Sequence, residues 1–118
     1  RDFLEWRCPD ALLITETNVP HTENLSYLRD GTQAHLAYNF TLAPLLTHAL
    51  ITGSSERIAA WLRESEQPPK GTTFLNFLAS HDGIGVRPVE DLLNDSEIEM
   101  LLAMNYAHSI FLLFIKLV

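Results

Sequence analysis

Three short apolar runs alternate with segments of helical spacing along this sequence. Residues 11–16 read ALLITE, with apolar side chains on both faces, as is typical of a buried parallel strand. Residues 35–41 alternate large apolar side chains with smaller or polar ones, and residues 72–79 are apolar, β-branched and aromatic. These three patterns predict strands.

Two helices are expected between the second and third strands. The first should begin near Thr41, whose hydroxyl can act as N-cap, because Pro44 breaks a helix but fits the first turn of a new one. Gly53 is a natural end for it. A second helix should follow, capped by Ser54 or Ser55.

The remaining segments complete the expected order of elements. Residues 1–7 have the pattern of the tail of a helix, and the polar run 17–32 predicts a loop with at most a short helical turn. After a loop over residues 80–93, Asn94 and Glu97 resemble a capping box, so a helix should start there. Strands that alternate with helices in this way indicate an α/β fold with a parallel sheet and right-handed crossovers.

Composition and charge narrow the possible functions. The 118 residues are 47% hydrophobic, which is enough for one small core, and the net charge of −7 repels nucleic acid and anionic lipid surfaces. Cys8 is the only cysteine, so an internal disulfide and a thiolate zinc site are excluded and a cytoplasmic location is expected.

The ends of the sequence suggest a fragment of a longer protein. The chain starts at Arg1 without methionine and shows no signal peptide. At the other end, residues 110–118 are strongly apolar but much shorter than the roughly 20 residues that a membrane-spanning helix needs. We therefore expect no membrane partner.

Two carboxylates follow predicted strands. Glu16 ends the first strand, Asp82 follows the third, and ligands of parallel α/β folds bind beyond the carboxyl ends of strands. Each acid alone could simply cap a helix or loop. Two carboxylates in one pocket raise each other's pKa, so one can donate a proton while the other stays ionised. Glycosyl transfer needs this pair, because it requires an acid for the leaving oxygen and negative charge near an oxocarbenium-like transition state.

The residues around Asp82 allow more than one interpretation. His81 could be a loop histidine bonded to a backbone carbonyl, or it could donate hydrogen bonds to sugar hydroxyls. Gly83 and Gly85 form neither a dinucleotide fingerprint nor a P-loop, and they would let the loop approach a ligand. No metal site is expected, because the other histidines lack ligand spacing: His21, His35, His48 and His108.

Three blocks of the sequence resemble consecutive blocks of the sucrose-phosphorylase branch of the α-amylase superfamily. They are residues 14–21 (ITETNVPH), 38–50 (YNFTLAPLLTHAL) and 77–88 (FLASHDGIGVRP). The first block is more similar to the glucosylglycerate-phosphorylase-like group than to sucrose phosphorylase itself. The resemblance extends from about Pro9 to Leu93 and fades beyond it.

This resemblance implies an incomplete (β/α)8 TIM barrel. A whole barrel takes roughly 250 residues, so residues 1–118 would form one partial catalytic domain, about half of the barrel, with strands five to seven and their helices. Glu16 would be the general acid/base, and Asp82 the second acid, which stabilises the transition state. His81 would bind the same sugar as Asp82. The family's nucleophilic aspartate lies on the fourth strand, before Arg1, so no residue here can be assigned to it.

The resemblance also implies the reaction. The enzyme would be a retaining α-glucosyl phosphorylase, which transfers glucose from sucrose or glucosylglycerate to inorganic phosphate and releases α-glucose 1-phosphate without a cofactor. A hydrolase or transglucosylase of the same superfamily remains an alternative. So does a non-catalytic truncated remnant, because half a barrel leaves strand edges and apolar faces uncovered. The isolated chain is expected to be inactive and prone to aggregate.

Arg87 is the basic residue nearest the predicted site. Its planar guanidinium suits the phosphate or the carboxylate of a glycerate-like substrate. The alternative is a surface salt bridge to Glu90 or Asp91.

Overall fold

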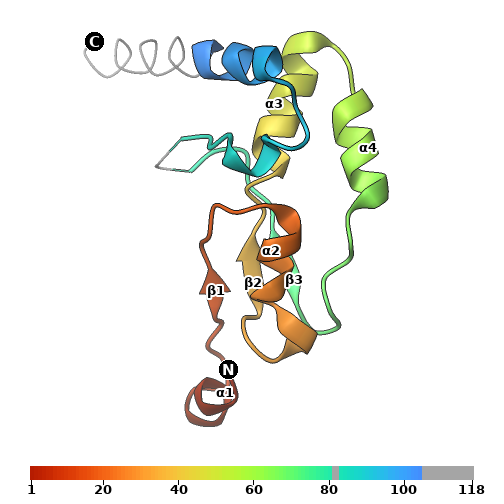
Figure 1. Ribbon diagram of the computed structural model, residues 1–118. Coiled ribbons are helices and arrows are strands. Elements are labelled where there is room, and N and C mark those ends of the chain that lie inside the picture. The colour runs from red at the N-terminus through yellow and green to blue at the C-terminus, as the bar shows by residue number, and fades with distance from the viewer. Residues whose placement is uncertain (81–82, 105–118) are drawn as a thin grey trace, which may run out of the picture.

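The computed structural model describes residues 1–80 and 83–104 as an α/β structure with a parallel three-stranded sheet (Figure 1). The strands lie side by side in chain order: β1 (Ile14–Thr15), β2 (Leu36–Tyr38) and β3 (Thr73–Leu75). In the register, Thr15 faces Ala37 and Ala37 faces Phe74. The expected parallel sheet is confirmed, although each strand is shorter than the apolar run that predicted it.

Two helices connect β2 to β3, as the sequence pattern predicts. The described helices with both ends defined are α1 (Asp2–Arg7), α2 (His21–Ser26), α3 (Leu42–Thr52) and α4 (Glu56–Glu64). A further helix begins at Asp95 and continues to the end of the described range at residue 104. Within the described ranges, no helix has the length and apolarity needed to cross a membrane.

The structure corrects the sequence analysis at residues 17–32, where a loop with at most a short helical turn was expected. This segment holds α2 and a 3-10 turn at Arg29–Gly31. Its polar residues are held by tertiary contacts, since the buried Asn24 donates from Nδ2 to the carbonyl oxygen of Tyr38 at 2.7 Å. Leu28, next to the turn, is fully buried. The polar composition indicated a loop. Composition does not show that a polar residue such as an asparagine can be buried and bonded to another element.

The helix caps follow the predictions in part. Gly53 ends α3 in the left-handed conformation, with φ of 69°, as expected of a residue without a side chain. The cap expected from the Thr41 hydroxyl is wrong: Thr41 has helical backbone angles and makes no side-chain cap bond. At α4 the oxygen of Ser54 accepts the N–H of Glu56 at 3.4 Å, whereas Ser55 makes no side-chain cap bond.

Two apolar clusters form the core. The sheet cluster consists of Leu28, Ala34 and Ala37, with Leu25 and Phe74 packed against it, and it covers one face of the sheet. The helix cluster joins α3, α4 and residues 89–101 through its buried members, Leu45, Trp61, Val89, Leu93 and Leu101. Neither cluster includes a residue from the opposite face of the sheet.

That opposite face is partly open. Side chains alternate along a strand, so Ile14 and its partner Leu36 point away from the face that Ala37 and Phe74 occupy. Ile14 is 43% exposed, and Leu12, two residues earlier, is 64% exposed. The described part of the chain therefore covers its sheet on one side only.

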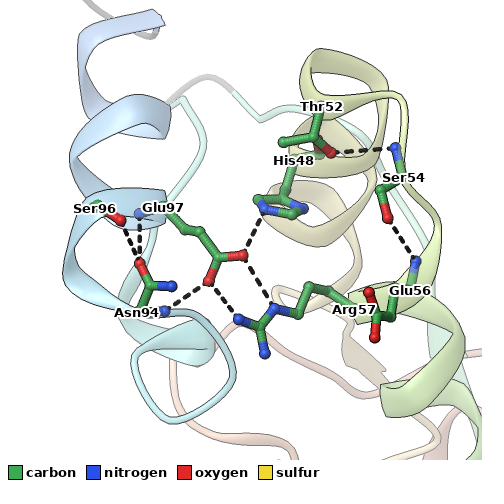
Figure 2. Close-up of polar contacts among 8 residues, drawn as sticks. All are labelled: His48, Thr52, Ser54, Glu56, Arg57, Asn94, Ser96 and Glu97. Atoms are coloured by element: carbon green, nitrogen blue, oxygen red, sulfur yellow. Dashed lines mark hydrogen bonds and ion pairs between the residues drawn. The ribbon is translucent and has the colours of Figure 1, made fainter.

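A carboxylate holds the helix that begins at Asp95 against the helix pair α3 and α4 (Figure 2). The expected capping box is confirmed: the N–H of Asn94 donates to Glu97 Oε2 at 2.8 Å, and the N–H of Glu97 donates to Asn94 Oδ1 at 3.0 Å. The same carboxylate accepts two bonds from Arg57 of α4, at 3.0 and 2.9 Å. It also lies 3.1 Å from Nε2 of His48, a buried residue of α3.

The charge on Glu97 is stabilised by these donors. The backbone N–H of Asn94 and then the guanidinium of Arg57 hold the pKa of Glu97 below its ordinary value of 4.5. Because its side chain is only 19% exposed, solvent screens these bonds less than it would on an open surface.

We predict that Glu97→Gln lowers the free energy of unfolding at neutral pH by about 1 to 2 kcal/mol, because charge-assisted bonds become neutral ones. The pKa of Glu97 is lower in the folded chain, so this stabilisation is present above about pH 4.5 and is lost as the pH falls through the folded-state pKa. Urea unfolding of the wild type and the variant, at pH values above and below 4.5, measures this difference in the free energy of unfolding. The exposed Glu99 of the same helix gives the matched control, Glu99→Gln, and equal losses in both variants would contradict the prediction.

We also predict that the open face promotes association. Leu12→Lys should raise the concentration at which the 118-residue chain starts to aggregate, because it places a charge beside the uncovered face of the sheet. Leu50→Lys is the matched control, since Leu50 is 78% exposed on α3, away from the sheet. Light scattering measures both variants, and an equal improvement would show that net charge, and not this face, controls association.

Candidate active site

A pocket of about 340 Å³ lies where the segments that follow the three strands meet. In a parallel sheet these segments leave from the same edge, and Figure 1 shows them at the end of the sheet opposite α1. The pocket is lined by Glu16, Asn18, Phe40, Ser80, Gly83, Ile84 and Gly85. A pocket therefore lies beyond the carboxyl ends of the strands, where the sequence analysis placed the site.

Glu16 follows β1 directly and has an exposed side chain. No hydrogen bond or ion pair joins its carboxylate to another described residue, in contrast to Glu97. The alternative in which Glu16 is a helix cap does not apply, because the N-cap of α2 is Pro20. An unpartnered carboxylate in a pocket is chemically free to exchange a proton with a bound molecule.

Ser80 and Gly83, in the segment after the third strand, line the same pocket and pair with each other. The N–H of Gly83 donates to the carbonyl oxygen of Ser80 at 3.0 Å, and a weaker bond of 3.4 Å runs in the other direction. His81 and Asp82 lie between these two residues in the sequence and fall outside the described residues. The structure thus unites Glu16 with both neighbours of the His81-Asp82 pair, and the roles of His81 and Asp82 stay predictions.

Arg87 is not among the residues that line the pocket. It starts a 3-10 turn, Arg87–Val89, and its side chain is exposed. Among the described residues it forms no ion pair, so the salt bridge to Glu90 or Asp91 is absent. A role for Arg87 with phosphate or carboxylate stays a prediction.

Phe40 gives the pocket an apolar wall that the sequence analysis did not single out. Its ring lies 5.7 Å from the ring of Tyr38 and 5.1 Å from that of Phe77, and Tyr38 and Phe77 are 5.2 Å apart. These three rings fix one another across the ends of β2 and β3. The alternation of residues 35–41 places Phe40 two residues beyond Tyr38, and this pattern could have indicated that both rings lie on the same side of the strand.

Hydrogen bonds of an asparagine join the segments that follow β2 and β3. Asn39, which is 7% exposed, donates from Nδ2 to Asn76 Oδ1 at 2.8 Å and from its backbone N–H to Leu75 at 3.0 Å. These bonds hold the segments after β2 and β3 in a fixed relation. Unlike Asn39 and Asn76, Asn18, two residues after Glu16, lines the pocket itself. Its position just beyond a strand was a usable signal that the sequence analysis passed over.

A second pocket, of about 320 Å³, lies against α4 and has mainly apolar walls, which include Trp61, Pro88 and Leu92. Among the described residues, its lining includes none of those that the sequence analysis predicted for the site. The pocket that contains Glu16 is therefore the candidate active site.

Comparison with known proteins identifies relatives of this chain. No family model matches the sequence. The chain is 44% identical over 99 residues to glucosylglycerate phosphorylase of Escherichia coli and 46% identical over 109 residues to glucosylglycerate phosphorylase of Allomeiothermus silvanus. Sucrose phosphorylase of Streptococcus mutans is 39% identical over 64 residues, or 54% of this chain.

These alignments cover most of this chain and little of the relatives. The first two include 83% and 92% of the 118 residues but only 18% and 20% of the relatives' length. The chain thus spans about a fifth of the glucosylglycerate phosphorylases that it matches. Over that span, the chain is homologous to glucosylglycerate phosphorylases and sucrose phosphorylases, as a segment of that branch would be.

Proposed function

We propose that this sequence supplies the acid/base side of the active site of a retaining α-glucosyl phosphorylase. The donor would be glucosylglycerate or sucrose and the acceptor inorganic phosphate. The observation that carries this proposal is the carboxylate of Glu16, which has no partner among the described residues and lines one pocket with Ser80 and Gly83, the sequence neighbours of His81 and Asp82. The match to two glucosylglycerate phosphorylases supports phosphate as acceptor.

The reaction would proceed in two displacements. A carboxylate from another part of the enzyme attacks the anomeric carbon while Glu16 donates its proton to the glycosidic oxygen, and the leaving group departs as an alcohol. A phosphate oxygen then attacks the glucosyl-enzyme, its proton passes to Glu16, and α-glucose 1-phosphate is released. Glu16 ends the cycle protonated, as it began.

The other predicted residues would act on charge. Asp82 would stabilise the positive charge that develops on the sugar ring and bind sugar hydroxyls, and His81 would hydrogen-bond the same sugar. Arg87 would bind phosphate or the glycerate carboxylate, which requires the exposed side chain to turn toward the pocket. Phe40 would pack against the apolar face of a sugar ring.

The barrel is part of the same proposal. Three parallel strands in chain order, each followed by helical segments, fit strands five to seven of a (β/α)8 barrel. The open face with Ile14 and Leu36 would then point to the barrel interior, where the remaining strands would cover it. Cytoplasmic location fits a lone, exposed Cys8.

We predict that the segment works when the rest of the enzyme is provided. A chimera in which these residues replace the matching 99-residue segment of the E. coli glucosylglycerate phosphorylase should release α-glucose 1-phosphate from glucosylglycerate and phosphate. The 118-residue chain alone should release none, since it matches only 18% of that enzyme.

Product analysis with and without phosphate separates the possible activities. Free glucose as the product in the presence of phosphate would indicate a hydrolase, and new glucosides would indicate a transglucosylase. A folded chimera without any of these products would favour the non-catalytic remnant and would reject the proposed function.

We predict that Glu16→Gln in this chimera lowers kcat on glucosylglycerate by about 100-fold or more, because the leaving oxygen loses its proton donor. With an activated donor such as α-glucosyl fluoride, whose leaving group needs no acid, the rate of the glucosylation step should fall much less. Glu23→Gln, at an exposed position on α2, is the matched control and should keep full activity. Normal turnover of glucosylglycerate by Glu16→Gln would disprove the acid/base assignment.

A further inference from the structure

Asn18 and Gly85 meet in the wall of the Glu16 pocket. Both residues line this pocket, Asn18 from the segment after β1 and Gly85 from the segment after β3. A Cβ atom on Gly85 would lie well under 3.0 Å from Nδ2 of Asn18 and 3.3 Å from its Cγ. The carboxamide of Asn18 therefore rests directly against the backbone of Gly85, in the space that a side chain would occupy.

The carboxamide of Asn18 has no structural role that would explain this placement. It makes no hydrogen bond to another described residue, and its side chain is exposed. A carboxamide offers two N–H donors and one oxygen acceptor. Asn18 is thus a polar group held in the pocket, two residues beyond Glu16, with its hydrogen-bonding capacity unused by the described chain.

We propose that Gly85 is a positioning residue that keeps the Asn18 carboxamide in place to bind an oxygen of the glucoside beside the glycosidic bond. This inference rests on the proposed function, because Glu16 must lie at the glycosidic oxygen for Asn18 to lie next to it. The ligand class is a polyhydroxylated or hydroxy-acid glucoside, whose oxygens both accept and donate hydrogen bonds.

The physical consequence of a side chain at residue 85 is specific. Gly85 does not have a positive φ, so alanine is compatible with its backbone. The group that alanine would strike is the end of a flexible, unpartnered side chain, which can rotate away at little cost. Gly85→Ala should therefore displace the carboxamide of Asn18 and leave the fold and its stability nearly unchanged.

The test compares Gly85→Ala, Asn18→Ala and the double variant in the chimeric phosphorylase. Each single variant should raise KM for glucosylglycerate about three- to ten-fold, the loss of roughly one hydrogen bond, with a smaller change in kcat. The double variant should equal Asn18→Ala, because the alanine at residue 85 then has nothing left to displace.

With an active wild-type chimera, two results would overturn this inference. One is a KM in the double variant that rises by the product of the two single effects, and the other is an unchanged KM in Gly85→Ala. An inactive wild-type chimera would instead reject the proposed function together with this inference. A second measurement needs no catalysis: in the ¹⁵N-labelled 118-residue chain, Gly85→Ala should shift the side-chain amide signals of Asn18. Unshifted signals would also refute the positioning role.

Discussion

Parallel backbone hydrogen bonding of β2 to both neighbours is the constraint on which the rest of the structure depends. It fixes β1 and β3 on either side of β2 with all three carboxyl ends at one edge. The segments that contain Glu16, Phe40 and Ser80 are far apart in the sequence and meet only because of this pairing. Parallel pairing also requires crossovers long enough to hold a helix, which places α2, α3 and α4 between the strands.

Buried polar bonds make this edge rigid enough to carry a site. Asn24 connects α2 to the end of β2, and Asn39 connects the ends of β2 and β3. Both asparagines are buried and bonded, so they specify one arrangement of the loops where apolar packing alone would allow several. In contrast, the side chains of Glu16 and Asn18 make no hydrogen bond to another described residue. The asparagines thus hold the pocket in shape, whereas Glu16 and Asn18 are available to a ligand.

The stability of the helical part and the chemistry of the pocket depend on different carboxylates. Glu97 is surrounded by donors that hold its pKa below the ordinary value, and it joins three helices. Glu16 stands alone at the edge of a sheet that is covered on one face only. The other face of the sheet is partly open among the described residues, where Leu12 and Ile14 are exposed.

The amino-acid sequence was enough to predict the parallel sheet, the two helices between β2 and β3, the end of α3 at Gly53, the capping box at Glu97 and the position of Glu16 after a strand. These depend on periodicity and on contacts between near neighbours, which local sequence encodes. Only the folded chain reveals that residues 17–32 hold a helix, that the Thr41 hydroxyl makes no cap bond, that Phe40 and Asn18 line the pocket and that Arg87 does not. Those outcomes depend on partners distant in the chain, such as Tyr38 for Asn24 and Gly85 for Asn18, and a residue's own type does not reveal such partners.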